Sequence, residues 1–420
     1  MNSTRRHFLR QLSATAAATA LTPDAFAADT PTKRVAAIVT HYTHNSHADV
    51  IVSRLLQGWN LDKKPPFPRL KLASLFTDQV PPKDMSRDLA TEHGFKIFPT
   101  IADALTLGGK DLAVDGVLLI GEHGNYPRSD TDQIMYPRRR FFEETAAVFR
   151  RTGKSVPVFS DKHLAWNWDD AKWMYDTARE LKAPLMAGSS VPGSWRYPAI
   201  EMKLGARAKE AIELSYGPQE GYSYHGLEAM QSIVERRRGG ESGVRNVQFV
   251  AGDEVWKAAA SGRFDMSLLD AAAKARQAKG RFKGEFKDAI KPTAYFIEHL
   301  DGFKSLLLHD TGAANSEWVT AWSEEGRKDH QATVHYTQEA RPFAHFTLLT
   351  QGIEQMIFSG KPTWPVERTL LVTGILAAAF QSRKQGGVRL DTPHLAISYK
   401  PTFTWKEPPP LPPDRPIQGQ

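Results

Sequence analysis

The first half of the chain contains the run Val114-Asp115-Gly116-Val117-Leu118-Leu119-Ile120, which is apolar apart from one aspartate. Similar short apolar runs lie at residues 34–40, 70–76, 95–98, 156–160 and 185–188. Runs of this length are typical of strands that are buried on both faces of a parallel sheet. Helical patterns separate them, over residues 48–59, 86–93, 101–107, 139–152 and 167–181. This alternation predicts an α/β fold, with a Rossmann-like doubly wound parallel sheet over residues 33–190.

The pattern changes after residue 190. Runs with β-forming residues recur without a helix between each pair, at 211–216, 246–251, 295–300, 304–309 and 331–336. Helical patterns cover 227–237, 268–278, 347–358 and 366–383. The pattern predicts an α+β domain with a mainly antiparallel sheet over residues 191–402. The proline-rich end, residues 403–420, is expected to be an extended arm.

Composition limits the class of protein. The chain has 420 residues, of which 41% are hydrophobic and 24% charged, so a wholly disordered chain is excluded and two to three domains are expected. Because there is no cysteine, disulfides, thiolate metal sites and cysteine nucleophiles are excluded. The net charge of +7 comes mostly from dispersed Lys and Arg. We therefore expect a small-molecule ligand and no nucleic-acid partner.

The N-terminus has the features of an export signal. Arg5 and Arg6 precede Phe8-Leu9, a mildly apolar run follows, and Ala25-Phe26-Ala27 matches the small-x-small cleavage pattern. Residues 1–28 are therefore predicted to be a twin-arginine signal peptide, whose partner is the twin-arginine translocase. No later segment is long and apolar enough to span a bilayer. The mature protein is expected to be periplasmic or secreted, and not an integral membrane protein.

Four segments are similar in order and spacing to segments of the Gfo/Idh/MocA oxidoreductases. They are residues 94–105, 114–120, 156–165 and 360–382. The resemblance implies an NAD(P)-binding domain at 33–190 and a substrate and oligomerisation domain at 191–402. It implies an oxidoreductase that acts on a sugar, a cyclitol or a related polyol. Because an open antiparallel sheet often pairs between subunits in that family, the resemblance also implies a homodimer or homotetramer.

The turn after the first strand departs from the family pattern. The family carries G-x-G-x-x-G there, because only glycine lets the backbone approach a pyrophosphate closely. Thr40, Tyr42 and Asn45 occupy the three glycine positions. We expect the Tyr42 ring to obstruct the diphosphate, so that NAD(P) binds weakly or not at all in the usual pose. If a cofactor binds, the candidate contacts are Thr40, His41, Tyr42, Asn45, Ser46, Asp78 and Glu122.

Asp78 follows the second strand, where the family has an acidic residue that binds the ribose. An ordinary turn aspartate before Pro81-Pro82 explains it equally well.

The resemblance also assigns catalytic candidates. Lys162 occupies the lysine position of the family's Glu-Lys-Pro segment, where it would meet the substrate hydroxyl. His225 and Glu228 match a His-x-x-Asp pattern, in which the histidine helps to move the hydroxyl proton. The alternatives are an ion pair for Lys162 and an ordinary interfacial histidine for His225.

A cluster of histidines suggests a second kind of site. His41, His44 and His47 follow the first strand, and Glu122 and His123 follow the fourth, its expected neighbour. These side chains would face one crevice and are low-probability ligands for a divalent metal. No metal is expected, since this spacing is not a known ligand pattern, and hydrogen bonding to sugar hydroxyls or helix capping are the alternatives.

Two further functions are therefore kept beside the oxidoreductase. One is a non-redox lyase, hydrolase or epimerase on the same scaffold, which uses the histidine cluster with or without a metal. The other is a periplasmic binding protein without catalytic activity.

Overall fold

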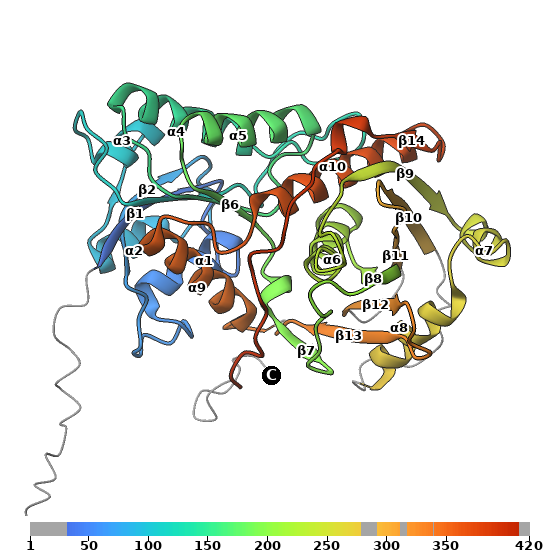
Figure 1. Cartoon of the computed structure of the whole chain (residues 1–420). Helices are drawn as coiled ribbons and strands as arrows, with labels where there is room; N and C mark the ends of the chain where they lie inside the picture. Colours follow the sequence, from blue (N-terminus) through green and yellow to red (C-terminus); the bar gives the residue numbers. More distant parts are fainter. Residues whose placement is uncertain (1–31, 279–291, 311–316, 339, 411–420) are drawn as a thin grey trace, which may run out of the picture. The chain divides into compact units, whose positions relative to one another are not determined.

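The apolar runs of the first half form a six-stranded parallel sheet in the computed structural model (Figure 1). Its strand order is β3-β2-β1-β4-β5-β6, which confirms the predicted doubly wound sheet. Val39 pairs with Thr77 on one side and Ile120 on the other, so these three strands end level. The strands are β1 (Lys33–Val39), β2 (Leu70–Thr77), β3 (Lys96–Ile97), β4 (Gly116–Ile120), β5 (Val158–Asp161) and β6 (Leu185–Gly188).

Helices cover both faces of this sheet, because the central strands β1, β4 and β5 are buried on both sides. One face packs against α1 (His47–Gln57), α2 (Ser86–His93) and α9 (Ala344–Ser359). The other packs against α3 (Ile101–Thr106), α4 (Arg138–Thr152) and α5 (Trp168–Glu180). The order of the strands reverses between β1 and β4, where the carboxyl ends of parallel strands leave a crevice.

The second sheet has eight strands in the order β14-β9-β10-β11-β8-β12-β13-β7. Only the β11–β8 pairing is parallel among the described strands, which confirms a mainly antiparallel sheet. The strands are β7 (Trp195–Tyr197), β8 (Ala208–Tyr216), β9 (Val244–Ala251), β10 (Pro292–His299), β11 (Lys304–Asp310), β12 (Trp318–Glu324), β13 (Gln331–Tyr336) and β14 (Leu390–Asp391).

Both faces of the second sheet are covered as well. The helices α6 (Gln219–Val234) and α10 (Val366–Lys384) pack on one face. The helices α7 (Asp253–Ala260) and α8 (Met266–Ala278) pack on the other through Val255, Leu268 and Leu269. Helices thus cover both faces of the second sheet, and the predicted dimer or tetramer stays a prediction.

Several details differ from the sequence-based expectations, among them the short strands β7 and β14, which were not predicted. The helix α6 starts at Gln219 rather than at 227, and β12 and α7 were not expected. The predicted arm has no regular secondary structure over 401–410, yet Trp405 anchors it. The Trp405 indole is buried, donates to the Ser194 carbonyl and lies under the Arg196 guanidinium.

The structure describes residues 32–278, 292–310, 317–338 and 340–410. The predicted signal peptide, residues 1–28, and the end of the arm lie outside this part of the chain. Within it, no helix has both the length and the hydrophobicity that crossing a membrane requires.

Candidate active site

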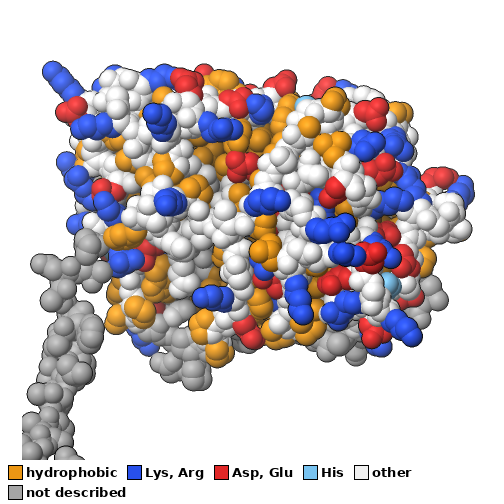
Figure 2. All heavy atoms as spheres, in the orientation of Figure 1, with side chains coloured by type: hydrophobic (Ala, Val, Ile, Leu, Met, Phe, Trp, Pro, Cys, Tyr) orange, Lys and Arg blue, Asp and Glu red, His pale blue; other side chains and the backbone are white. Residues whose placement is uncertain are grey.

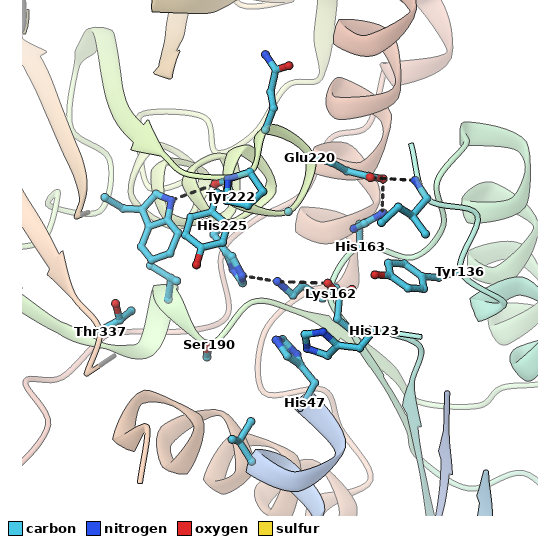
Figure 3. Close-up of a pocket in the computed structure, with 18 of the residues that line it drawn as sticks. His47, His123, Tyr136, Lys162, His163, Ser190, Glu220, Tyr222, His225 and Thr337 are labelled. Carbon is cyan, nitrogen blue, oxygen red and sulfur yellow. Dashed lines mark hydrogen bonds and ion pairs between the residues drawn. The ribbon is translucent and has the colours of Figure 1, made fainter. Parts of the chain in front are cut away.

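The crevice at the carboxyl edge of the first sheet opens into a cavity of about 610 Å³. Loops after β1, β4, β5 and β6 meet the start of α6 there, and Figure 3 shows side chains from each of them pointing into the space. The lining includes Lys162, His225, Glu220, Tyr136 and Tyr222. A crevice at this edge is where ligands bind in doubly wound folds.

Lys162 and His225, which lie 63 residues apart in sequence, are in direct contact in the cavity wall. The Lys162 Nζ and His225 Nε2 atoms are 2.5 Å apart, and His225 Nδ1 is 2.5 Å from Ser189 Oγ. Burial, and then the Lys162 ammonium, hold the pKa of His225 well below its usual value. A neutral imidazole therefore accepts a hydrogen bond from the ammonium and donates Nδ1–H to Ser189.

Glu122 connects this pair to the rest of the site. Its Oε1 atom is 3.9 Å from Lys162 Nζ, and its Oε2 atom accepts a 2.5 Å hydrogen bond from the buried Arg138. Burial alone would raise the Glu122 pKa, but the charges of Lys162 and Arg138 lower it to about 2. Glu122 is thus a fixed anion between two cations.

Arg138 also connects Glu122 to two polar side chains on the opposite part of the cavity wall, His163 and Glu220. Arg138 Nη1 is 3.2 Å from His163 Nε2, which lies 3.8 Å from Glu220 Oε1. Burial, and then Arg138, lower the pKa of His163 well below its usual value. Burial raises the pKa of Glu220 to about 7. Arg138, His163 and Glu220 were not among the site residues predicted from the sequence.

His47 and His123 also line the cavity, side by side. Their ring centroids are 5.2 Å apart, and His47 Nδ1 is 2.6 Å from Asp161 Oδ2. Burial, and then His47, lower the pKa of His123 to about 4. The position of the two rings fits hydrogen bonding to a ligand. Among the residues that the structure describes, no three His, Asp or Glu side chains are arranged to hold a metal ion.

The turn between β1 and α1 is held together by its own side chains. Ser46 caps α1 by accepting from the Asp49 amide. Asp49 Oδ2 accepts from the Asn45 amide at 2.8 Å, and Asp84 Oδ2 accepts from the Tyr42 amide at 3.3 Å. Thr40 Oγ1 donates to the Glu122 carbonyl at 2.5 Å.

The expectation about Tyr42 is wrong. Its ring is fully buried, and its hydroxyl lies 2.7 Å from Ser53 Oγ, so the ring points into the core and not into the crevice. The turn fails to fit a pyrophosphate for another reason: carboxylates occupy amides that a dinucleotide would need, and they would repel its charge. Residues of this turn therefore do not fit NAD(P) in the usual pose.

The other predicted site residues lie around the cavity rather than in its wall. Asp78 accepts a 2.7 Å hydrogen bond from the Tyr126 hydroxyl and pairs with Arg140. His44 is 65% exposed, and its Nδ1 atom is 3.8 Å from Asp49 Oδ2. The His41 ring lies 5.9 Å from that of His123.

Glu228 is fully buried behind the end of β6 and is not among the cavity-lining residues. A Cβ atom on Gly188 would lie 3.2 Å from its Oε2 atom, so glycine permits this close approach. Burial raises the Glu228 pKa to about 7, although the Arg368 charge opposes the shift. Its predicted catalytic role stays a prediction without direct access to the cavity.

A parallel sheet with a crevice at its switch point, followed by a mainly antiparallel sheet, is an architecture found among dehydrogenases. By sequence, neither a family model nor a curated protein matches the chain. Solved structures do match it in fold. Myo-inositol dehydrogenase from Lactobacillus casei, in complex with NAD(H) and myo-inositol, has a TM-score of 0.55 at 11% identity, over 89% of this chain and 99% of that one.

Two further structures give the same result. Scyllo-inositol dehydrogenase from Lactobacillus casei, with bound NAD(H) and scyllo-inositol, has a TM-score of 0.53 at 12% identity, over 86% of this chain and 99% of that one. An NAD-binding oxidoreductase from Klebsiella pneumoniae has a TM-score of 0.51 at 13% identity, over 86% and 98%. At these identities the likeness shows the fold alone, and at that level it agrees with the Gfo/Idh/MocA resemblance.

Proposed function

We propose that this chain is an enzyme that acts on a sugar, a cyclitol or a related polyol, and that Lys162 and His225 move a proton at one substrate oxygen. The observation that supports this proposal is the 2.5 Å contact of the two side chains in the wall of the cavity. The ammonium polarises or protonates an oxygen, and the neutral imidazole takes or returns a proton.

The substrate class follows from the cavity and from the fold. Polar side chains alternate with the rings of Tyr136, Tyr222 and Trp318 around the lining, and aromatic faces with hydrogen-bonding groups suit a hydroxylated ring. On the face that Figure 2 shows, Lys and Arg are interspersed with Asp and Glu, as in a protein with a small-molecule ligand.

Two reaction types fit this proposal. An oxidoreductase is favoured by the fold, since the neighbours in complex with NAD(H) are dehydrogenases. A non-redox lyase, hydrolase or epimerase is favoured by the turn between β1 and α1, whose amides already bind Asp49 and Asp84. No bound metal is part of either proposal.

The test is turnover of a panel of inositols, hexoses and their keto derivatives, with products identified by mass spectrometry. We expect Lys162→Ala and His225→Ala each to lower turnover by about 10²-fold or more, the scale of a positioned acid–base group. Lys172→Ala is the control, because Lys172 pairs with Asp176 on the exposed side of α5. Near-normal turnover in either site variant would remove that residue from the mechanism. Binding without turnover would indicate a binding protein instead.

We also propose that the chain is exported to the periplasm or secreted by the twin-arginine translocase. The proposal rests on Arg5 and Arg6 and on the Ala25-Phe26-Ala27 cleavage pattern.

A further inference from the structure

A second hollow, with a volume of about 330 Å³, lies outside the candidate active site. It shares three segments of the chain with the cavity, which are the residues after β5, the loop between β4 and α4, and the end of α10. On α10, Arg383 lines the cavity, whereas Gln381 and Gln385 line the second hollow. A hollow of this volume has room for a small ligand.

Trp166 in the wall of this hollow has no structural role that packing explains. Its side chain is half-buried, and within the described part of the chain it has no hydrogen-bond or ring partner and belongs to no hydrophobic core cluster. Its neighbour Trp168 packs against two core clusters and against Gly374, where a Cβ atom would lie 3.0 Å from Trp168 Cε3. Core packing therefore accounts for Trp168 but not for Trp166.

The backbone is fixed on both sides of Trp166. The Leu164 amide donates to Thr373 Oγ1 on α10 at 3.2 Å. Asn167 caps α5, because its Oδ1 atom accepts from the Asp170 amide at 2.8 Å. An aromatic side chain on so short a fixed segment loses little freedom when a ligand stacks on it. Trp166 is thus a preorganised aromatic surface in the hollow.

Polar side chains with unused hydrogen-bonding groups surround Trp166. Gln381 and Gln385 lie one turn apart at the end of α10, and neither side-chain amide has a partner among the described residues. The exposed Asp391 carboxylate has no partner there either. Burial lowers the pKa of His394, so its neutral imidazole can both donate and accept a hydrogen bond.

We propose that this hollow is a second binding site, which takes one ring of an uncharged saccharide. A pyranose ring has a face of C–H groups that packs on an aromatic ring, and hydroxyls at its rim that donate and accept. Trp166 supplies the aromatic face, and Gln381, Gln385 and Asp391 supply partners for the hydroxyls. None of the described residues that line the hollow is Lys or Arg, so the lining does not favour an anion.

This site goes beyond the proposed function, because binding there requires neither Lys162 nor turnover. Asp130 and Thr131 line the hollow, and Asp132 and Ile134 in the same loop line the cavity. The two sites are therefore separated by one short loop. A saccharide chain held at Trp166 would lie next to the proposed active site.

The experiment follows the fluorine NMR signals of 5-fluorotryptophan in the mature protein during titration with cellotetraose, maltotetraose and laminaritetraose. Single Trp→Phe variants at Trp166, Trp168 and Trp318 assign three of the signals. Trp166 and Trp168 report on the second hollow, and Trp318 reports on the cavity. We expect at least one of the three saccharides to shift the Trp166 and Trp168 signals, whatever the Trp318 signal does.

Substitutions in the hollow should weaken this binding, with the affinity read from the Trp168 signal. Trp166→Ala should weaken it by about tenfold or more, and Trp166→Phe by less, because a phenyl ring keeps part of the stacking face. Gln381→Ala and Gln385→Ala should each weaken it by about threefold to tenfold. Gln355→Ala is the control, because Gln355 is an exposed glutamine on α9 outside the hollow, and it should change nothing.

Three results would overturn the second site. They are a shift of the Trp318 signal alone, no shift with any of the saccharides, and unchanged affinity in Trp166→Ala. A shift caused by choline chloride and by none of the saccharides would indicate a cation site and would overturn the saccharide ligand. Turnover by Lys162 and His225 is measured separately, so either proposal can fail while the other stands.

Discussion

Asp49 holds the turn between β1 and α1 closed, and its removal should be costly. Its carboxylate is fully buried in the first turn of α1. One oxygen accepts from Arg341 Nη1 at 2.7 Å and from the Asn45 amide at 2.8 Å, and the other accepts from Ser53 Oγ at 2.6 Å. The carboxylate therefore satisfies a cation, an amide and a hydroxyl at once.

The magnitude follows from these contacts. Removing one partner of a buried ion pair costs about 3–5 kcal/mol, because the other partner is left without its counter-charge. The hydrogen bonds to Asn45 and Ser53 are lost in the same substitution and are not additive with this cost. We expect Asp49→Ala to lower the free energy of unfolding by about 3–5 kcal/mol.

Urea unfolding followed by tryptophan fluorescence measures this loss. Asp88→Ala is the matched control, because Asp88 is also an acidic residue in the first turn of a helix but is exposed on α2. The control should lie within about 1 kcal/mol of the wild type. A loss below about 1 kcal/mol for Asp49→Ala would show that the carboxylate does not hold the turn together.

Three other predictions follow from the site and the sequence. Calorimetric titration of the mature protein with NAD or NADP should detect no binding tighter than about millimolar, and micromolar binding would show that the turn opens for a dinucleotide. Glu122 has a pKa lowered to about 2 in the folded protein against about 4.3 when unfolded, so it stabilises the fold above the unfolded value and loses this contribution as pH falls towards 2. Glu122→Gln should therefore flatten the pH dependence of stability between these values, and an unchanged acid-unfolding curve would contradict the assignment. Changing both Arg5 and Arg6 to Lys should leave the precursor in the cytoplasm, whereas continued export would refute the twin-arginine assignment.

The two sheets were predictable because their strands are apolar runs of the right length, such as Gly116–Ile120. The start of α6 was not predictable from helix propensity. Gly221, Tyr222 and Gly226 have weak helix propensity, so the first two turns give no clear helical pattern. Pro218 with Glu220 two residues later is a helix-start signal that was available. Glu220 lies in the part of α6 that the predicted helix did not include.

The conformation of the turn between β1 and α1 could not be predicted from the sequence, for a different reason. A residue in a turn points either into the core or into the crevice, and nothing local to Tyr42 decides which. The amide of Tyr42 binds Asp84, which lies 42 residues away, and Arg341 approaches Asp49 from 292 residues away. The Lys162–His225 pair was identified only through the family resemblance, because its contact joins the residue after β5 to helix α6, which no spacing rule connects.

The backbone at Lys162 has a consequence for how this chain evolves or is engineered. Lys162 has a φ of 67°, in the left-handed region, and this twist breaks the strand alternation just after β5. It allows Asp161, Lys162 and His163 to reach three different partners, but it costs a residue other than glycine about 1–2 kcal/mol. Lys162→Gly would relieve this strain, but it would also remove the ammonium group that pairs with Glu122. Stabilised variants of this chain should be checked first at position 162.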